Sequence, residues 1–199
     1  MFQGLSNNKR RTFLGIANGK ITYKPNKDAE PQQYENLDGI LTGITTRDAN
    51  VNNTQMKFYD LAIVDGNGEE AILSVVAEGG VARGLILALA NVKDFSLPIR
   101  IHTYAGDSQG KTYTNTIVYQ NGVKVPWIIE MKDLPKGLPL MDAKGRPFYS
   151  NGVQQYDYSE RNEKIEEYVN LINSRCVKKS EEENPEVDFD DENDMPANL

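Results

Sequence analysis

Basic and aromatic side chains alternate along several β-like segments of this sequence. Because successive side chains of a strand point to opposite faces, Arg100, His102 and Tyr104 share one face of segment 97–104. The residues that carry this pattern are Arg47, Lys57, Phe58, Tyr59, Arg100, His102, Tyr104, Lys111, Tyr113 and Tyr119. A groove for single-stranded nucleic acid needs cations that follow the phosphates and rings on which bases stack. These residues therefore predict a nucleic-acid-binding surface built on strands.

Some of these rings have a second interpretation. Tyrosine is favoured in strands for its packing alone, so a given ring can cover the core instead of contacting a ligand. Phe58 has the same two interpretations, whereas Trp127 is predicted to belong to the core. His102 lies between Arg100 and Tyr104 in a polar pattern, so we expect its side chain to be exposed.

No set of residues in the sequence forms a recognisable catalytic or metal site. His102 is the only histidine and Cys176 the only cysteine, so neither a histidine cluster nor a zinc-binding cysteine pair can form. Gly79-Gly80 before a predicted helix could hold a phosphate, but a short glycine pattern is a weak signal and we expect a simple turn. The acidic C-terminal segment lacks the fixed shell that a divalent ion needs. We therefore expect no catalytic activity, no cofactor and no metal.

The segments that carry the candidate residues follow the order of a small β-barrel. Asn18-Gly19 predicts a tight hairpin within 13–23, because both residues tolerate positive φ. From residue 37 the predicted order is three strands, one helix and two strands, at 37–47, 56–64, 69–77, 81–90, 97–104 and 111–119. The OB-fold, a five-stranded barrel that often binds oligonucleotides, has this order. Gly39 and Gly43 in the first strand predict the bulge that such a barrel requires. The predicted fold class is therefore mainly β, with an OB-like five-stranded barrel and one helix between its third and fourth strands.

Composition divides the chain into four predicted parts. Residues 1–12 form a flexible basic arm, and residues 13–129 form the OB-like nucleic-acid-binding domain with the hairpin at its start. Residues 130–177 form an extension that packs on the barrel and ends in a helix. Residues 178–199 are rich in charge and poor in apolar side chains, so we expect a disordered acidic tail.

Charge is distributed unevenly along the chain, whose formal net charge is −7. Residues 181–199 contain nine acidic side chains and no basic one, whereas the first 180 residues contain 20 acidic and 22 basic ones. Such an asymmetry is typical of a body that binds a polyanion and a tail with a separate role.

The sequence predicts a cytoplasmic protein without a membrane partner. Its first residues lack the charged start and apolar middle of a signal peptide, and no apolar stretch approaches the ~20 residues of a membrane span. A single cysteine forbids an intrachain disulfide framework and agrees with a reducing compartment.

The tail contains Asp188-Phe189-Asp190-Asp191 followed by Asp194-Met195-Pro196, and the predicted hairpin opens with Phe-Leu-Gly-Ile-Ala-Asn-Gly-Lys-Ile from residue 13. In these motifs the chain resembles bacterial and phage single-stranded-DNA-binding proteins, which place an OB-fold first and end in an acidic tail. The resemblance implies that the tail binds replication or repair proteins through Asp188, Phe189, Asp190, Asp191, Asp194, Met195, Pro196 and Leu199. The chain departs from the family at its end, because Ala197-Asn198-Leu199 replace the terminal phenylalanine. A tail that only keeps the protein soluble is the alternative.

These observations favour a sequence-tolerant single-stranded-DNA-binding protein of replication, recombination or repair, in the host cytoplasm if it is phage-encoded. Self-association to a homo-oligomer is left open. A structural or adaptor β-barrel of a phage assembly is one alternative. An RNA-binding OB module is another, because only RNA offers the 2′-hydroxyl group. A nucleic-acid hydrolase ranks last, since no acid–base or metal set is visible.

Overall fold

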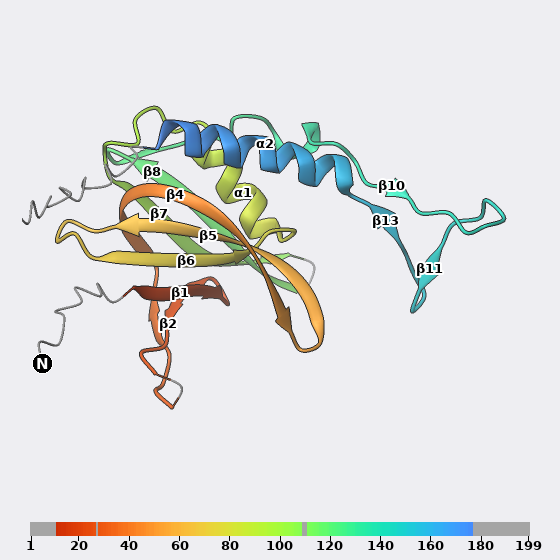
Figure 1. The fold of residues 1–199 in the computed structure, drawn as a ribbon, viewed down its shortest axis with the longest axis horizontal. Helices are drawn as coiled ribbons and strands as arrows, with labels where there is room; N and C mark the ends of the chain where they lie inside the picture. Colours follow the sequence, from red (N-terminus) through yellow and green to blue (C-terminus); the bar gives the residue numbers. More distant parts are fainter. Residues whose placement is uncertain (1–10, 27, 109–110, 177–199) are drawn as a thin grey trace, which may run out of the picture.

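The computed structural model describes residues 11–26, 28–108 and 111–176 (Figure 1). This part of the chain is mainly β, as predicted, with one nine-stranded mixed sheet and two α-helices. The strand order across the sheet is β3-β2-β1-β6-β5-β4-β7-β8-β9. The two helices are α1 (Gly80–Leu89) and α2 (Ser159–Arg175).

The chain begins with a hairpin of β1 (Thr12–Ala17) and β2 (Lys20–Tyr23). Its turn is the predicted Asn-Gly pair, with φ of +51° at Asn18 and +74° at Gly19. A Cβ atom at Gly19 would lie 2.2 Å from the backbone nitrogen of Ala105, so the hairpin turn packs directly on a later strand. A third strand, β3 (Gln32–Tyr34), pairs with β2.

The longest strand, β4 (Asn36–Val51), curves through the body and joins two parts of the sheet (Figure 1). Its first residues pair with β7 (Ile99–Ser108), and the remainder pairs with β5 (Thr54–Val64). The register shifts between Leu41 and Gly43, as the glycines in this strand predict. The connection between β4 and β5 is a two-residue turn, because Asn52 and Asn53 adopt positive φ, and both strands are therefore longer than the expected 37–47 and 56–64.

The core lies between the inner face of the sheet and the two helices. Helix α1 follows β6 (Glu70–Val76) and is buried along most of its length. Helix α2 contributes Ile165, Val169 and Ile172 to the same core. The side-chain amide of Asn173 accepts a hydrogen bond from Ile44 N at 2.7 Å and donates one to Ile44 O at 2.8 Å, which attaches α2 to β4. Neither helix of the described chain is long and apolar enough to cross a membrane.

The hydrogen-bonded sheet has two edges, at β3 and at β9 (Val123–Lys124). Within the described residues, therefore, no strand pairing closes the sheet into a ring. Strand β8 (Lys111–Gln120) lies between β7 and β9. β9 has two residues and ends shortly before Pro126, which has no amide hydrogen with which to continue a ladder.

The extension at 130–177 was expected to pack on the barrel and to end in a helix, and part of it packs on the core. Leu134 and α2 are packed against the core, whereas residues 138–158 extend away from the sheet (Figure 1). This segment contains four two-residue strands that pair with one another. They are β10 (Leu138–Pro139), β11 (Tyr149–Ser150), β12 (Val153–Gln154) and β13 (Tyr156–Asp157). A short 3-10 helix, Met131–Asp133, precedes them.

Two predicted parts lie outside the described residues. They are the basic arm up to residue 10 and the acidic tail. The tail includes the predicted partner-binding residues Asp188, Phe189, Asp190, Asp191, Asp194, Met195, Pro196 and Leu199.

Candidate nucleic-acid interface

Strand β7 presents its polar and aromatic side chains on one face, as the alternation of the sequence predicts. Ile99, Ile101 and Thr103 are buried, with at most 2% of their surface exposed. Arg100 and Tyr104 are exposed and His102 is half-buried on the opposite face. The predicted exposure of His102 is therefore only partly met.

Strand β8 continues this face across the sheet. Its antiparallel register places Tyr119 opposite Arg100, Ile117 opposite His102 and Asn115 opposite Tyr104. Residues that are directly opposite in an antiparallel pair have their side chains on the same face. We call the combined surface the β7–β8 face, and it consists of Arg100, His102, Tyr104, Tyr113, Asn115, Ile117 and Tyr119.

Rings on the β7–β8 face are open to solvent and already stacked in part. The rings of His102 and Tyr104 lie 5.8 Å apart between centroids, with planes 17° from parallel. Tyr104 is 39% exposed and Tyr113 is 47% exposed. Tyr113 is opposite Gly106, which has no side chain to cover it. Exposed rings of this kind offer their π-faces to bases of any sequence.

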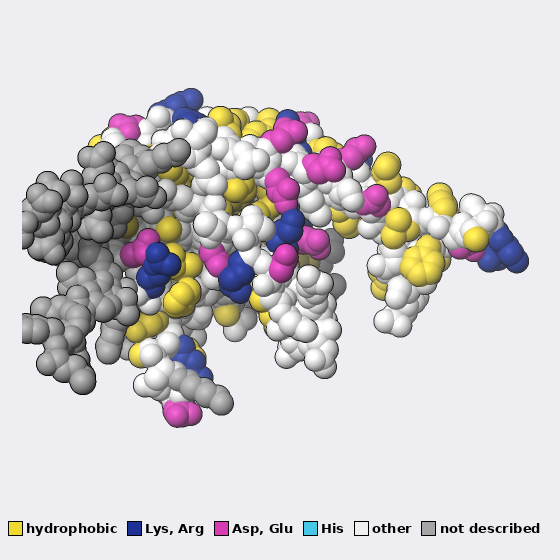
Figure 2. All heavy atoms as spheres, viewed as in Figure 1, with side chains coloured by type: hydrophobic (Ala, Val, Ile, Leu, Met, Phe, Trp, Pro, Cys, Tyr) yellow, Lys and Arg dark blue, Asp and Glu magenta, His cyan; other side chains and the backbone are white. Residues whose placement is uncertain are grey.

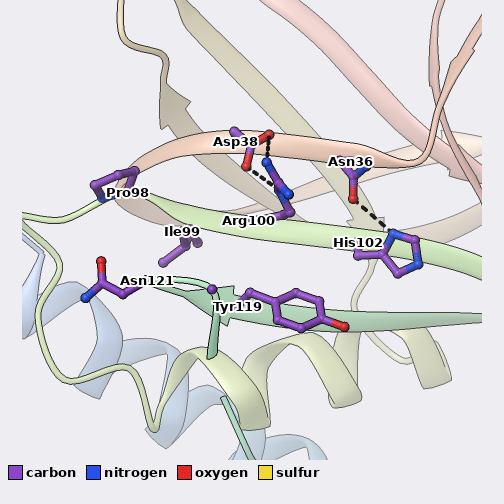
Figure 3. A pocket seen from close by; sticks show the side chains of 9 residues that line it. Asn36, Asp38, Pro98, Ile99, Arg100, His102, Tyr119 and Asn121 are labelled. Carbon is purple, nitrogen blue, oxygen red and sulfur yellow. Dashed lines mark hydrogen bonds and ion pairs between the residues drawn. The ribbon is translucent and has the colours of Figure 1, made fainter. Parts of the chain in front are cut away.

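A groove of about 620 Å³ crosses the first half of this face (Figure 3). Asn36 and Asp38 of β4 line one side, and Tyr119 of β8 lines the other. Arg100 and His102 of β7 lie between them. His102 Nδ1 is 3.0 Å from Asn36 Oδ1, an interaction that sets the orientation of the imidazole ring.

Arg100 is the cation of this groove, and it is paired with Asp38. Its Nε donates to Asp38 Oδ1 at 2.7 Å and its Nη2 donates to Asp38 Oδ2 at 3.2 Å (Figure 3). The hydrogen bond to Asp38 raises the pKa of Arg100 above its ordinary value. Both side chains are more than half exposed, at 55% and 54%. Because an exposed ion pair contributes little to stability, a phosphate group can replace the carboxylate as the partner of Arg100.

Arg47 and Phe58 form a different cluster, on β4 and β5. Arg47 Nε donates to Asp60 Oδ2 at 2.7 Å, and its guanidinium lies 5.0 Å from the centre of the Phe58 ring. Asp60 is buried and also accepts a hydrogen bond from Ser74 Oγ at 2.6 Å. Burial acts to raise the pKa of Asp60, but the hydrogen bonds from Arg47 and Ser74 outweigh it and lower the pKa below its ordinary value.

The structure does not bring this cluster to the β7–β8 face. Arg47 is opposite Phe58 of β5, whereas β4 pairs with β7 only at its start, over Asn36–Gly39. The predicted single groove is therefore divided into two regions.

Lys57 and Tyr59 point to the other side of β5. Lys57 Nζ lies 2.7 Å from Glu166 Oε1 of α2. Tyr59 is only 2% exposed, and burial is the main reason that its pKa is raised to about 12. The predicted ligand contact of Tyr59 is therefore corrected: its ring is part of the core. Lys111 occupies the expected strand, opposite Ser108 of β7.

Sequence reasoning missed Asn36 and Asp38, and it misplaced Trp127. Asn36 precedes the strand expected at 37–47, and Asp38 is the second residue of that strand. No local sequence pattern indicates that this end of the strand lies beside β7. Trp127 was predicted to be in the core, but it is 40% exposed and packs with its ring edge near Gly84. It lines a second groove of about 400 Å³ together with Tyr104 and Ile117.

Within residues 11–26, 28–108 and 111–176, no group of three or more histidine, cysteine, aspartate or glutamate side chains is arranged to hold a metal ion. Cys176 is buried, which raises the pKa of its thiol to about 11. A neutral, buried thiol is a poor nucleophile.

No known protein family and no curated protein matches this chain. Among solved structures, it is similar to an OB domain from Thermoplasma acidophilum determined in solution. That similarity has a TM-score of 0.24 and a sequence identity of 15%, and it covers 49% of this chain and 82% of the other. A similarity at this level carries no argument about function, so the function is inferred from the strands and side chains of this chain alone.

Proposed function

We propose that this chain is a sequence-tolerant single-stranded-DNA-binding protein of DNA replication, recombination or repair, without catalytic turnover. The observation that carries the proposal is the β7–β8 face, where accessible tyrosine rings flank an arginine in an exposed ion pair. Bases stack on Tyr104, Tyr113 and Tyr119, while Arg100 exchanges Asp38 for a phosphate. Affinity then falls as salt rises, because each phosphate contact releases counterions.

The strand order supports an OB-like arrangement. The central strands lie in the order β6-β5-β4-β7-β8, with α1 between β6 and β7 in the sequence. The curved β4 pairs with β7 at its start and with β5 over the rest of its length, so one strand connects both halves. OB-folds have this order of three strands, helix and two strands, and many bind oligonucleotides.

The acidic tail has a separate role in this proposal. Its acidic side chains steer it to basic pockets on replication or repair proteins, and apolar residues such as Phe189 and Leu199 anchor it there. The protein would act in the cytoplasm, where these partners and single-stranded DNA occur together.

The test is a titration of fluorescein-labelled dT oligonucleotides, followed by anisotropy at about 50 and 200 mM salt, a range over which phosphate contacts weaken measurably. Duplex DNA and RNA of matched length serve as competitors. Tyr104→Ala and Tyr113→Ala should each weaken binding by about 1–3 kcal/mol, the typical contribution of a base stacked on a ring. Phe13→Ala is the control, because Phe13 is an exposed ring (64%) on β1 that lies opposite Ile72 of β6, whereas the hairpin of β1 and β2 meets β7 at its turn, at Gly19.

Binding to single strands that is lost in both tyrosine variants and kept in the control supports the proposal. If the two tyrosine variants bind DNA as tightly as the control variant, the β7–β8 face is not the DNA-binding surface. A preference for RNA would instead identify an RNA-binding OB module. Absence of binding at the lower salt concentration, with the tail removed, would reject the function and favour a structural or adaptor role.

A further inference from the structure

The second groove, of about 400 Å³, adjoins the β7–β8 face, and Trp127 supplies its largest ring. Tyr104, Asn115 and Ile117 belong both to this groove and to the β7–β8 face, so the two surfaces are continuous. Residues 138–158 also carry exposed hydrophobic side chains (Figure 2), but none of them lines either groove. Trp127 is therefore an exposed ring that adjoins the β7–β8 face without belonging to it.

The indole of Trp127 is held in place by helix α1. The next residue in the chain, Ile128, donates its backbone N–H to Leu87 O at 3.0 Å. A Cβ atom added at Gly84 would be in ordinary contact with Trp127 Cζ2, at 3.6 Å, so the indole lies close to the helix at this glycine. The helix supports the indole while 40% of the residue surface remains exposed. A ring held in this way loses little freedom when a ligand stacks on it.

The edge of β8 presents backbone groups to the same groove. Within the described residues, β9 pairs only with Tyr119 and Gln120, and Val125 N donates to Val118 O at 2.8 Å just beyond that pairing. Because the N–H and C=O groups of every second residue in an antiparallel strand point to the same side, those of Thr116 point to this edge as well. Thr116 also lines the groove. One donor and one acceptor of the main chain are therefore directed to it.

These groups match the surface of an unpaired nucleobase. Such a base has two π-faces that stack on aromatic rings, and a rim of hydrogen-bond donors and acceptors. Trp127 provides a ring for stacking, Ile117 and Val125 provide apolar walls, and the backbone of Thr116 can bind the rim. Because stacking tolerates any base, a site of this kind agrees with binding that does not depend on sequence.

The charged side chains of this groove are Lys124 and Glu130. In contrast to Arg100, Lys124 has no ion-pair partner in the part of the chain that the structure describes. It is opposite Tyr119, which lines the first groove, so Lys124 lies at the boundary between the two grooves. We propose, on the basis of the DNA-binding function proposed above, that Trp127 stacks on a base of the same single strand that crosses the β7–β8 face, and that Lys124 binds a phosphate between the two grooves.

The site can be observed directly, because Trp127 is the only tryptophan of the chain. The test is a titration of the full chain with an unlabelled dT oligonucleotide, followed by tryptophan fluorescence, beside the anisotropy titration of labelled dT in the same buffer. Stacking on a base quenches the fluorescence of an indole. The quenching should therefore follow the same binding curve as the anisotropy, and duplex DNA should produce little of it.

Variants test the contribution of the ring and of the cation. Trp127→Ala should weaken dT binding about 5- to 140-fold, the loss expected when one stacked base loses its ring. Trp127→Phe retains a ring and should recover most of this affinity. Lys124→Ala should reduce the salt slope by about 0.7, the contribution of one phosphate contact. Phe13→Ala, at an exposed ring outside both grooves, is the control and should bind as the wild type does. Thermal unfolding by circular dichroism checks that the variants are folded.

Unchanged tryptophan fluorescence during binding that anisotropy detects would overturn the inference and leave the proposed function intact. So would wild-type affinity in Trp127→Ala. Equal quenching by duplex DNA would also overturn it, because a paired base cannot stack on the indole. Absence of binding by both measurements would reject the inference together with the proposed function.

Discussion

Removing the carboxylate that competes for Arg100 should strengthen DNA binding. In Asp38→Asn, Arg100 loses a charged partner 2.7 Å away while the side-chain volume is kept. A unit charge about 4 Å from a phosphate in water changes an equilibrium roughly fivefold. We therefore expect about fivefold tighter binding of a dT oligonucleotide at low salt.

The salt dependence gives a second readout of the same variant. Each phosphate contact to single-stranded DNA contributes a slope of about −0.7 in log affinity against log salt concentration. In the wild type Asp38 competes with the phosphate for Arg100, so the variant gains at most one phosphate contact and loses at most about 2.6-fold more affinity than the wild type between about 50 and 200 mM salt. Anisotropy titrations at several salt concentrations resolve a slope change of this size.

Glu166→Gln is the matched control, because it releases Lys57 from an ion pair of the same 2.7 Å length. Lys57 is opposite Asp48, ten positions along β4 from Asp38, and it is directed to α2 rather than to the β7–β8 face. We expect the DNA affinity and the salt slope of Glu166→Gln to match those of the wild type. Equal gains in Asp38→Asn and Glu166→Gln would mean that net charge alone matters. A gain that persists when Arg100→Ala is added to Asp38→Asn would refute the role of Arg100.

Three further predictions concern stability and the tail. Asp60→Asn should cost about 1–3 kcal/mol at neutral pH, because Arg47 and Ser74 lose a charged acceptor. The pKa of Asp60 is lowered in the folded state, so the carboxylate stabilises the fold above pH ~4 and this stabilisation is lost as pH falls through the folded pKa. In urea unfolding at about pH 3, the free energies of unfolding of Asp60→Asn and the wild type should therefore differ less than at neutral pH. Gly19→Ala should lower the melting temperature measured by calorimetry, because φ is +74° and Ala105 N would lie 2.2 Å from the new Cβ; an unchanged melting temperature would contradict this packing. Deleting residues 181–199 should keep or raise DNA affinity in the anisotropy assay, since the tail competes as a polyanion, and a large loss would contradict that competition.

The sequence predicts well those features that depend on the local period of the chain. The two-residue alternation of β7 places Ile99 and Ile101 inside and Arg100 outside, as observed. The same rule, applied to β5, would have placed Tyr59 with Leu61 and Ile63, which are both buried. The signal for the burial of Tyr59 was therefore present in the sequence.

Features that depend on which strands are neighbours could not be predicted in this way. The pairing of Asp38 with Arg100 joins residues 62 positions apart, and it requires that β4 lies beside β7. The separation of Arg47 from the β7–β8 face likewise results from the length and course of β4. Residues 138–158 belong to the extension expected to pack on the barrel, but many of their large hydrophobic side chains are exposed, because composition alone does not determine which element covers a segment.

In the proposed function, the balance of charge and rings on the β7–β8 face also determines selectivity for single strands. Asp38 neutralises Arg100, so a duplex, which offers phosphates but no free bases, gains little there. A single strand adds stacking on Tyr104 and Tyr113, at about 1–3 kcal/mol for each base. Selectivity in this scheme comes from the rings, while Asp38 suppresses binding that depends on charge alone. Asp38→Asn should therefore strengthen duplex binding by a larger factor than single-strand binding, and an equal gain for both would show that Asp38 plays no part in selectivity.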